Sequence, residues 1–365
     1  MGLFDIFEKE NESKIKFTEQ ELLKKLEFKD RVIKSLERNI ESKNNEIEAL
    51  KQELSKYQSP NNEPSNSSQE VTSTNQVEEK TDQETQNAIP ATPKAIQEIP
   101  DTNEMRKRLL DRIKEETKTR SYFIDYELSN EDDIFMSKFG GLGYWDKSMQ
   151  YPTDDNGNQL VLLAQINFDR DKFNDSRLPN HGILQFYILP DDTYGLDVRR
   201  SSKVIYHENV NYSLRKEELS NIKTNLTLDG NNGEYFPFEK EFKISFTEKE
   251  DYINPTSYNF KELVDRIVAE EFKIDLGNNG LFRFFGDKIM DYLYENLNTY
   301  GNKLLGYPYF TQTDPRESTG FNEYKVLLFQ MDSDTDIMWG DSGVANFFIK
   351  DYNNLTDSLF TWDCM

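Results

Sequence analysis

Two apolar runs in the later part of the chain follow almost the same order of residues. The runs at 161–166 and 326–331 read Val-Leu-Leu-Ala-Gln-Ile and Val-Leu-Leu-Phe-Gln-Met, and each leads to a second apolar run, at 182–188 and 343–349. A glycine followed by an aromatic residue precedes both copies. Self-similarity between distant segments is the signature of repeated structure, so this pattern predicts a duplicated β unit.

Further strands and helices are predicted around these two units. Apolar side chains at helical spacing predict helices over 258–274 and 282–297, and Asp101 and Thr102 can cap a helix that carries Met105, Leu109 and Ile113 on one face. Strands interrupted by helices favour an α+β fold, an internally duplicated β-rich domain with intervening helices. The predicted strands are 161–168, 183–189, 204–207 and 242–246.

Residues 15–57 carry a heptad repeat of apolar residues. Isoleucine predominates at one core position and leucine at the other, the combination that favours a parallel two-stranded coiled coil. The repeat therefore predicts a homodimer, and the alternative is a single amphipathic helix that packs on its own domain. The predicted dimerisation residues are Leu22, Leu26, Ile33, Leu36, Ile40, Ile47, Leu50 and Leu54.

The remaining segments differ in composition. Residues 1–14 form a short apolar N-terminus, too short for a membrane span, for which contact with a membrane surface and contact with a partner both stay open. Residues 58–100 contain no aromatic residue and are rich in Ser, Asn, Gln, Glu and Pro, which predicts a disordered linker. The folded domain is therefore expected over 101–365, preceded by the linker and the N-terminal coiled-coil helix.

Charge and cysteine content narrow the class of protein. The net charge is −23, and residues 101–365 carry 30 Lys and Arg against 47 Asp and Glu. An acidic surface repels phosphate backbones, so nucleic acid is not an expected ligand, whereas a basic protein partner is electrostatically favoured. The one cysteine, Cys364, cannot form an internal disulfide, which favours a cytoplasmic location.

Two glutamines at matching places in the repeat are the leading candidates for a polar site. Gln165 and Gln330 interrupt apolar strands, so each amide either satisfies itself internally or faces a ligand. The internal, structural interpretation is the expected one. The candidate ligand-binding set that the alternative requires is Gln165, Asp169, Gln312, Asp314, Gln330, Asp332, Asp334, Trp339, Gly340 and Asp341.

The aspartates at 332, 334 and 336 resemble the opening of a calcium loop, because alternate carboxylates can direct oxygens at one hard cation. The pattern then fails, since Ile337 and Gly343 stand where an EF-hand needs Gly and Glu. Asp332, Asp334 and Asp336 are therefore weak metal-ligand candidates, and a solvated turn is the expected alternative.

No set of residues in the sequence forms a recognisable catalytic centre. The two histidines are His181 and His207, no serine sits in a nucleophile elbow, and no glycine-rich phosphate loop follows a strand. No catalytic residue is predicted, and the sequence does not identify a cofactor.

Several short motifs after residue 100 resemble the YwqG-like family, a bacterial domain of unknown function. The resemblance implies an α+β fold with internal duplication and no established activity. The motifs are Gly140-Gly141, Tyr151-Pro152, Leu163-Ala164-Gln165-Ile166, Leu178-Pro179-Asn180-His181-Gly182, Leu305-Gly306-Tyr307-Pro308, Gln330-Met331-Asp332-Ser333-Asp334, Met338-Trp339-Gly340-Asp341-Ser342-Gly343 and Phe360-Thr361-Trp362-Asp363-Cys364.

Two functions remain as hypotheses. The leading one is a non-catalytic binding or interaction module of unknown ligand, dimerised by the N-terminal coiled coil, of which immunity-like binding of a basic protein is one version. The alternative is an enzyme of unknown reaction that uses the Gln/Asp/Trp cluster with a divalent cation.

Overall fold

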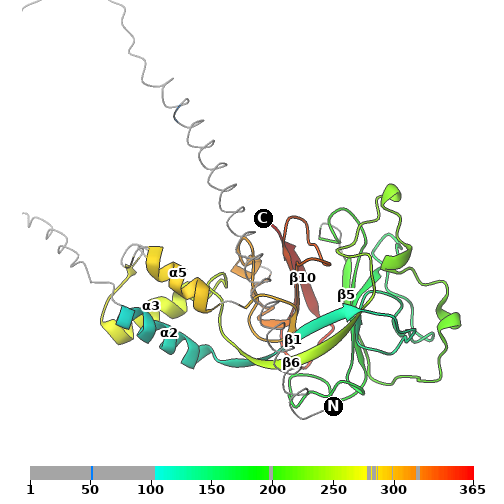
Figure 1. Ribbon diagram of the computed structural model, residues 1–365, viewed down its shortest axis with the longest axis horizontal. Coiled ribbons are helices and arrows are strands. Elements are labelled where there is room, and N and C mark those ends of the chain that lie inside the picture. The colour runs from blue at the N-terminus through cyan, green and yellow to red at the C-terminus, as the bar shows by residue number, and fades with distance from the viewer. Residues whose placement is uncertain are drawn as a thin grey trace, which may run out of the picture. The chain divides into compact units, whose positions relative to one another are not determined.

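The computed structural model describes Lys51 and residues 103–365, except 197–199, 278–280, 282–284, 286, 298 and 318–320 (Figure 1). The chain divides into two units, Met1–Gln97 and Glu98–Met365, and the second contains all of the described residues except Lys51. The predicted short N-terminus at 1–14, coiled coil at 15–57 and linker at 58–100 lie outside the described residues, Lys51 excepted.

The second unit is built on one ten-stranded antiparallel sheet. Its strand order is β10-β9-β8-β7-β1-β6-β2-β3-β4-β5. The strands are β1 (Thr119–Leu128), β2 (Lys138–Phe139), β3 (Val161–Asn167), β4 (Ile183–Ile188), β5 (Ser202–His207), β6 (Phe242–Asp251), β7 (Lys303–Leu304), β8 (Val326–Asp332), β9 (Val344–Ile349) and β10 (Ser358–Asp363). The strands predicted at 161–168, 183–189, 204–207 and 242–246 correspond to β3, β4, β5 and β6.

The order of strands repeats on either side of the β1–β6 pair. Outward from β6 come β2, β3, β4 and β5, and outward from β1 come β7, β8, β9 and β10. The registers match as well, because Gln165 pairs with Gln185 in the first half and Gln330 pairs with Asn346 in the second. A register shift also falls at the same place in β3 and β8, between Leu162 and Ala164 and between Leu327 and Phe329.

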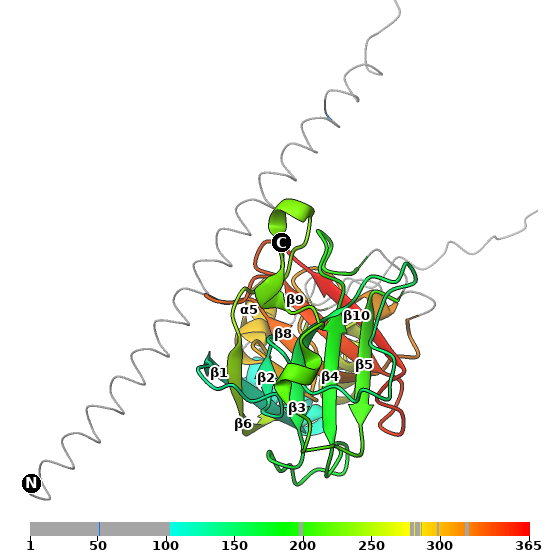
Figure 2. The same cartoon turned by 90° about the vertical axis from the view of Figure 1, so that its right-hand side faces the viewer.

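The two halves of the sheet face each other across the main core. The fully buried Phe186 ring of β4 lies 4.6 Å from the Phe329 ring of β8 and 5.1 Å from the Phe347 ring of β9, measured between centroids. Figure 2 shows β3, β4 and β5 in front of β8, β9 and β10. The Trp362 indole of β10 donates to the Thr193 carbonyl at 2.7 Å, which brings the two ends of the sheet together and makes it nearly closed.

Three helices form a separate apolar cluster at one side of the sheet (Figure 1). They are α2 (Asn103–Thr117), α3 (Phe260–Phe272) and α5 (Asp287–Asn296). Apolar residues three and four positions apart give each helix one buried face, as the sequence predicted for these segments. Short 3₁₀ turns complete the chain at η1 (Lys216–Leu219), η2 (Asn225–Thr227), η3 (Gly230–Asn232) and η5 (Pro315–Glu317). Among the described helices, none has the length and apolar character needed to cross a bilayer.

Candidate functional site

A buried lysine in β2 is the centre of the candidate site. Lys138 is almost fully enclosed, and its ammonium donates to the Leu142 carbonyl and to Glu241 Oε1, both at 3.0 Å. Burial lowers the pKa of Lys138, and the charge of Glu241 opposes that change. Because a buried ammonium is stable only when it is paired and hydrogen-bonded, Lys138 fixes Glu241 in place.

A left-handed glycine provides the space for this carboxylate. Gly141 has φ of +66°, and a Cβ added there would lie 1.7 Å from Glu241 Oε2. The Gly141 amide also donates to Asn225 Oδ1 at 2.7 Å. Only glycine combines this backbone conformation with so close an approach, so the Gly140-Gly141 motif is part of the Lys138–Glu241 arrangement.

The second half of the sheet contains the same arrangement. The ammonium of Lys303 in β7 lies 2.7 Å from Asp251 Oδ2, and burial lowers the pKa of Lys303. Gly306 has φ of +84°, and a Cβ added there would lie 2.0 Å from the same oxygen. Glu241 directly precedes β6 and Asp251 is its last residue, so one strand supplies a carboxylate to each half.

Exposure distinguishes the two copies. The side chains of Lys303 and Asp251 are 0% and 1% exposed, whereas that of Glu241 is 18% exposed. Glu241 lines a groove of about 370 Å³ formed by the end of β1, the segment before β6 and the turns at η1 and η2. The copy in the second half is sealed, and the copy in the first half opens to solvent.

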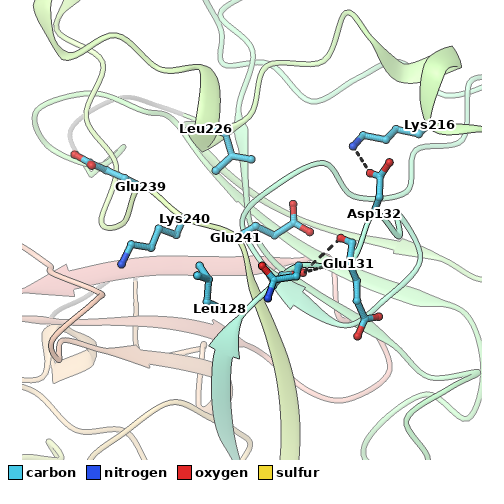
Figure 3. A pocket seen from close by; sticks show the side chains of 10 residues that line it. Leu128, Glu131, Asp132, Lys216, Leu226, Glu239, Lys240 and Glu241 are labelled. Carbon is cyan, nitrogen blue, oxygen red and sulfur yellow. Dashed lines mark hydrogen bonds and ion pairs between the residues drawn. The ribbon is translucent and has the colours of Figure 1, made fainter.

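The groove combines apolar and acidic side chains. Figure 3 shows Leu128 and Leu226 on either side of the Glu241 side chain, and they are 55% and 52% exposed. Its acidic residues are Glu131, Asp132, Glu239 and Glu241, and its basic residues are Lys216 and Lys240. Lys216 pairs with Asp132 and Lys240 with Asp336. Glu131 pairs with Lys243 and Glu241 with Lys138, so Glu239 is the lining carboxylate that has no ion pair among the described residues. The groove therefore presents one unpaired carboxylate, that of Glu239, and two exposed leucines.

The two candidate glutamines lie in different halves and satisfy their amides locally. Gln165 donates to two carbonyls of the segment before β2, at 2.9 and 2.8 Å, and accepts from the Tyr144 amide at 2.9 Å. Gln330 donates to two carbonyls before β7, at 3.1 and 2.8 Å, and accepts from the Tyr309 amide at 2.8 Å. Each glutamine fixes the segment that leads into a two-residue strand.

The candidate aspartates form hydrogen bonds in separate turns. Asp169 accepts from the Tyr212 hydroxyl at 2.7 Å, and Asp334 accepts from the Tyr126 hydroxyl. Asp332 accepts from the Gly301 amide at 2.8 Å, while Asp336 pairs with Lys240. Within the described part of the chain, no group of three or more His, Cys, Asp or Glu side chains is arranged to hold a metal ion.

The remaining candidates lie near the C-terminal strand or in the core. Trp339 is fully buried, with its ring 5.5 to 6.2 Å from those of Tyr194, Phe360 and Trp362. Gly340, Asp341 and Gln312 all lie beside the last residues of the chain. A Cβ added at Gly340 would lie 2.9 Å from Cys364 Sγ, and the Asp341 carbonyl accepts a hydrogen bond from the Met365 amide at 3.1 Å. Gln312 Nε2 donates to the Cys364 carbonyl at 2.6 Å. Asp314 forms a buried ion pair with Arg316 at 2.6 Å.

The lysine–carboxylate pairs were not predicted from the sequence. One signal was present, because Lys138 precedes Gln165 and Lys303 precedes Gln330 by the same 27 residues. No such spacing marks Glu241 and Asp251, since they stand at opposite ends of β6, Glu241 directly before it and Asp251 as its last residue.

Comparison with known proteins places this site inside one family domain. The model of the DUF1963 family, described as a domain of unknown function, matches residues 137–364, which include both lysines and both carboxylates. No curated protein gives a match. Because this family model matches more than half of the chain, the chain belongs to the DUF1963 family.

Proposed function

From this membership of a family without a known activity, we propose that residues 101–365 form a binding module that takes a basic peptide segment with apolar side chains into the groove beside Glu241. The observation that carries the proposal is the groove itself, in which two exposed leucines lie beside a fixed carboxylate. The partner is a protein with a basic, partly apolar surface segment, and immunity-like binding of a basic protein is one version of this function.

The two leucines supply the apolar part of the binding energy. Leu128 and Leu226 are more than half exposed, and covering one such side chain contributes on the order of 1–2 kcal/mol. Because they lie on either side of Glu241, an apolar side chain between them is held next to the Glu241 carboxylate, which is paired with Lys138 (Figure 3). A leucine flanked by lysine or arginine fits this arrangement.

The unpaired carboxylate of Glu239 supplies selectivity for basic partners. Glu239 is exposed, and no ion pair to it is found among the described residues. Glu241 is held by a buried lysine, so it does not have to be ordered when the partner binds. Opposite charges at a rim mainly raise the association rate and exclude acidic partners.

The finer assignments made from sequence are part of this proposal. We propose that the heptads at 15–57 form a parallel coiled-coil homodimer, that the protein is bacterial and cytoplasmic, and that the domain is YwqG-like. A dimer joined through the predicted linker at 58–100 presents two grooves to one partner, which raises the effective affinity for repeated or dimeric targets.

The test uses the full chain and a short fluorescent peptide of alternating lysine and leucine. Fluorescence anisotropy should detect binding that weakens about tenfold for Leu226→Asp and at least severalfold for Glu239→Lys. A matched peptide of alternating glutamate and leucine should not bind. Glu248→Lys, which reverses an exposed charge at the far end of β6, serves as the control and should leave binding unchanged. Equal binding of both peptides, or insensitivity to Leu226→Asp, would contradict the proposal.

A further inference from the structure

Strand β1 is fully paired along one edge and only partly paired along the other. One edge pairs with β6 along the whole strand. The other edge pairs with β7 at Tyr122 and Phe123, and the Ile124 amide donates to the Asn302 carbonyl at 2.8 Å. Residues 125–128 therefore have a described strand on one side only, and we call the other side of these residues the open edge of β1.

The backbone groups of Tyr126 and Leu128 face this open edge. In an antiparallel pair, the amide and carbonyl of successive residues face opposite edges of the strand. The Ser129 amide donates to the Glu241 carbonyl on the β6 side at 2.9 Å, whereas the Ile124 amide donates on the β7 side. Counting by twos from Ile124, Tyr126 and Leu128 face the β7 side as well. Within the described part of the chain, no hydrogen bond to the amide or carbonyl of either residue is found.

The side chains at the open edge alternate in chemical character. Asp125 and Glu127 are exposed on one face of β1, and Leu128 is 55% exposed on the other. Lys243 stands opposite Glu127 in β6 but pairs with Glu131. No ion pair to Asp125 or Glu127 is found among the residues that the structure describes. The open edge is therefore acidic on one face and apolar on the other.

The corresponding edge of β6 differs in its charges. The described part of β2 pairs with the first residues of β6, so residues 246–250 have β1 on one side and no described strand on the other. There Glu248 lies 3.8 Å from Arg120. Glu250 pairs with Lys118. The carboxylates at the open edge of β1 have no such cation, so that edge favours a basic partner.

We infer, on the basis of the function proposed above, that the open edge of β1 takes the partner's basic segment as an added antiparallel strand in which basic and apolar residues alternate. Its apolar residues lie opposite Tyr126 and Leu128 and exchange backbone hydrogen bonds with them. They share the face of Leu128, which lines the groove (Figure 3). Its basic residues lie on the face of Asp125 and Glu127. A second copy would bring its own acidic edge here, and like charges exclude it.

The first test places a single N-methyl group in the alternating lysine–leucine peptide, on a central leucine or on a central lysine. The leucine amides face β1 in this arrangement and the lysine amides face solvent. Methylation at leucine should therefore weaken binding to the full chain about tenfold, and methylation at lysine should change it less than about twofold. Both peptides have the same composition and charge, so fluorescence anisotropy compares backbone pairing alone.

The outcomes separate this binding mode from the proposed function. Equal affinities of the two methylated peptides, or a larger loss from the lysine methylation, would overturn the added strand while the unmethylated peptide still binds. No binding of the unmethylated peptide would overturn both.

The second test exchanges the charges at the open edge. The double variant Asp125→Lys/Glu127→Lys should bind the lysine–leucine peptide about tenfold more weakly and should gain binding of the matched glutamate–leucine peptide. Glu248→Lys/Glu250→Lys makes the same change of net charge on β6 and should alter neither affinity. Equal behaviour of the two double variants would mean that net charge selects the peptide, and would overturn the inference.

Discussion

Lys138 and Lys303 occupy the same position in the two halves of the sheet, where each pairs with a glutamine: Lys138 with Gln165 and Lys303 with Gln330. Each ammonium group is buried against a carboxylate at one end of β6. Only the Lys138–Glu241 pair opens to solvent. The sealed Lys303–Asp251 pair therefore shows what the same ion pair contributes to stability when water does not reach it.

Removing the two lysines should therefore have unequal effects on stability. Lys303→Met leaves Asp251 buried without its cation and should lower the free energy of unfolding by about 3–5 kcal/mol. Lys138→Met should cost about 1–2 kcal/mol, because water in the groove can solvate Glu241. Urea unfolding of both variants measures the difference, and equal losses would mean that the groove does not admit water to Glu241.

Three glycine substitutions separate backbone strain from steric overlap. Gly157 has φ of +85° with open space around it, so Gly157→Ala should cost only about 1–2 kcal/mol of strain. Gly141→Ala and Gly306→Ala add a collision with Glu241 or Asp251 and should cost more than Gly157→Ala. Thermal unfolding checks the order, and equal losses at the three positions would mean that the carboxylates move aside without cost.

The position of Trp339 predicts a structural role for the Trp-Gly-Asp turn. Its ring is fully buried among aromatic residues, so Trp339→Ala should lower the free energy of unfolding by about 3–5 kcal/mol. Met338→Ala, next to it and 42% exposed, is the control and should change stability little. A stable Trp339→Ala variant that loses peptide binding would instead favour a ligand site at this turn.

His207 and Asp363 should give opposite pH dependence from equivalent positions. Burial lowers the pKa of His207 from 6.5 to about 4, so the unfolded state binds the proton more readily than the folded state. The free energy of unfolding therefore falls by up to about 3 kcal/mol as the pH drops from 6.5 to 4. The pKa of Asp363 is raised from 3.8 to about 6, so the folded state binds the proton more readily than the unfolded state. Stability therefore falls by up to about 3 kcal/mol as the pH rises from 3.8 to 6.

Single substitutions isolate the two contributions. Asp363→Asn should be more stable than the wild type at neutral pH, and His207→Gln should flatten the loss of stability on the acidic side. Urea unfolding across pH 4 to 8 provides the measurement. A pH profile that neither variant changes would assign the titration to other groups.

Assembly is the fifth prediction. The full chain should be dimeric and a chain trimmed to residues 101–365 monomeric, because the heptads lie between residues 15 and 57. Light scattering at micromolar concentration compares the two. If the trimmed chain is also dimeric, the dimer contact lies in the folded domain and not in the heptads.

The sequence predicted the four strands that are apolar along their whole length and, in part, β5 and β6, but it missed β1, β2 and β7. β3, β4, β8 and β9 are buried on both faces, so they appear as continuous apolar runs. β1 was missed because exposed and charged residues break its pattern, and β2 and β7 have only two residues each. Strands of that length exist only through the pairing of their neighbours.

The lysine–carboxylate pairs of the candidate site were also missed because they depend on the tertiary structure. Lysine is normally an exposed residue, so nothing local marks Lys138 or Lys303 as buried. Their carboxylate partners lie 103 and 52 residues away in the chain. The glutamines were found because they interrupt apolar strands, but the peptide groups that satisfy them come from loops whose path depends on the tertiary structure.

The placement of β1 has a consequence for synthesis of the protein. A ribosome releases β1 first, yet in the sheet this strand belongs with β7–β10, which emerge last. The N-terminal strand can pair with β6 once residue 251 has left the exit tunnel, but its other edge stays open until residues 303 and 304 arrive. A nascent chain stalled between these points exposes that edge to other chains, and this interval is where we expect the protein to depend most on chaperones.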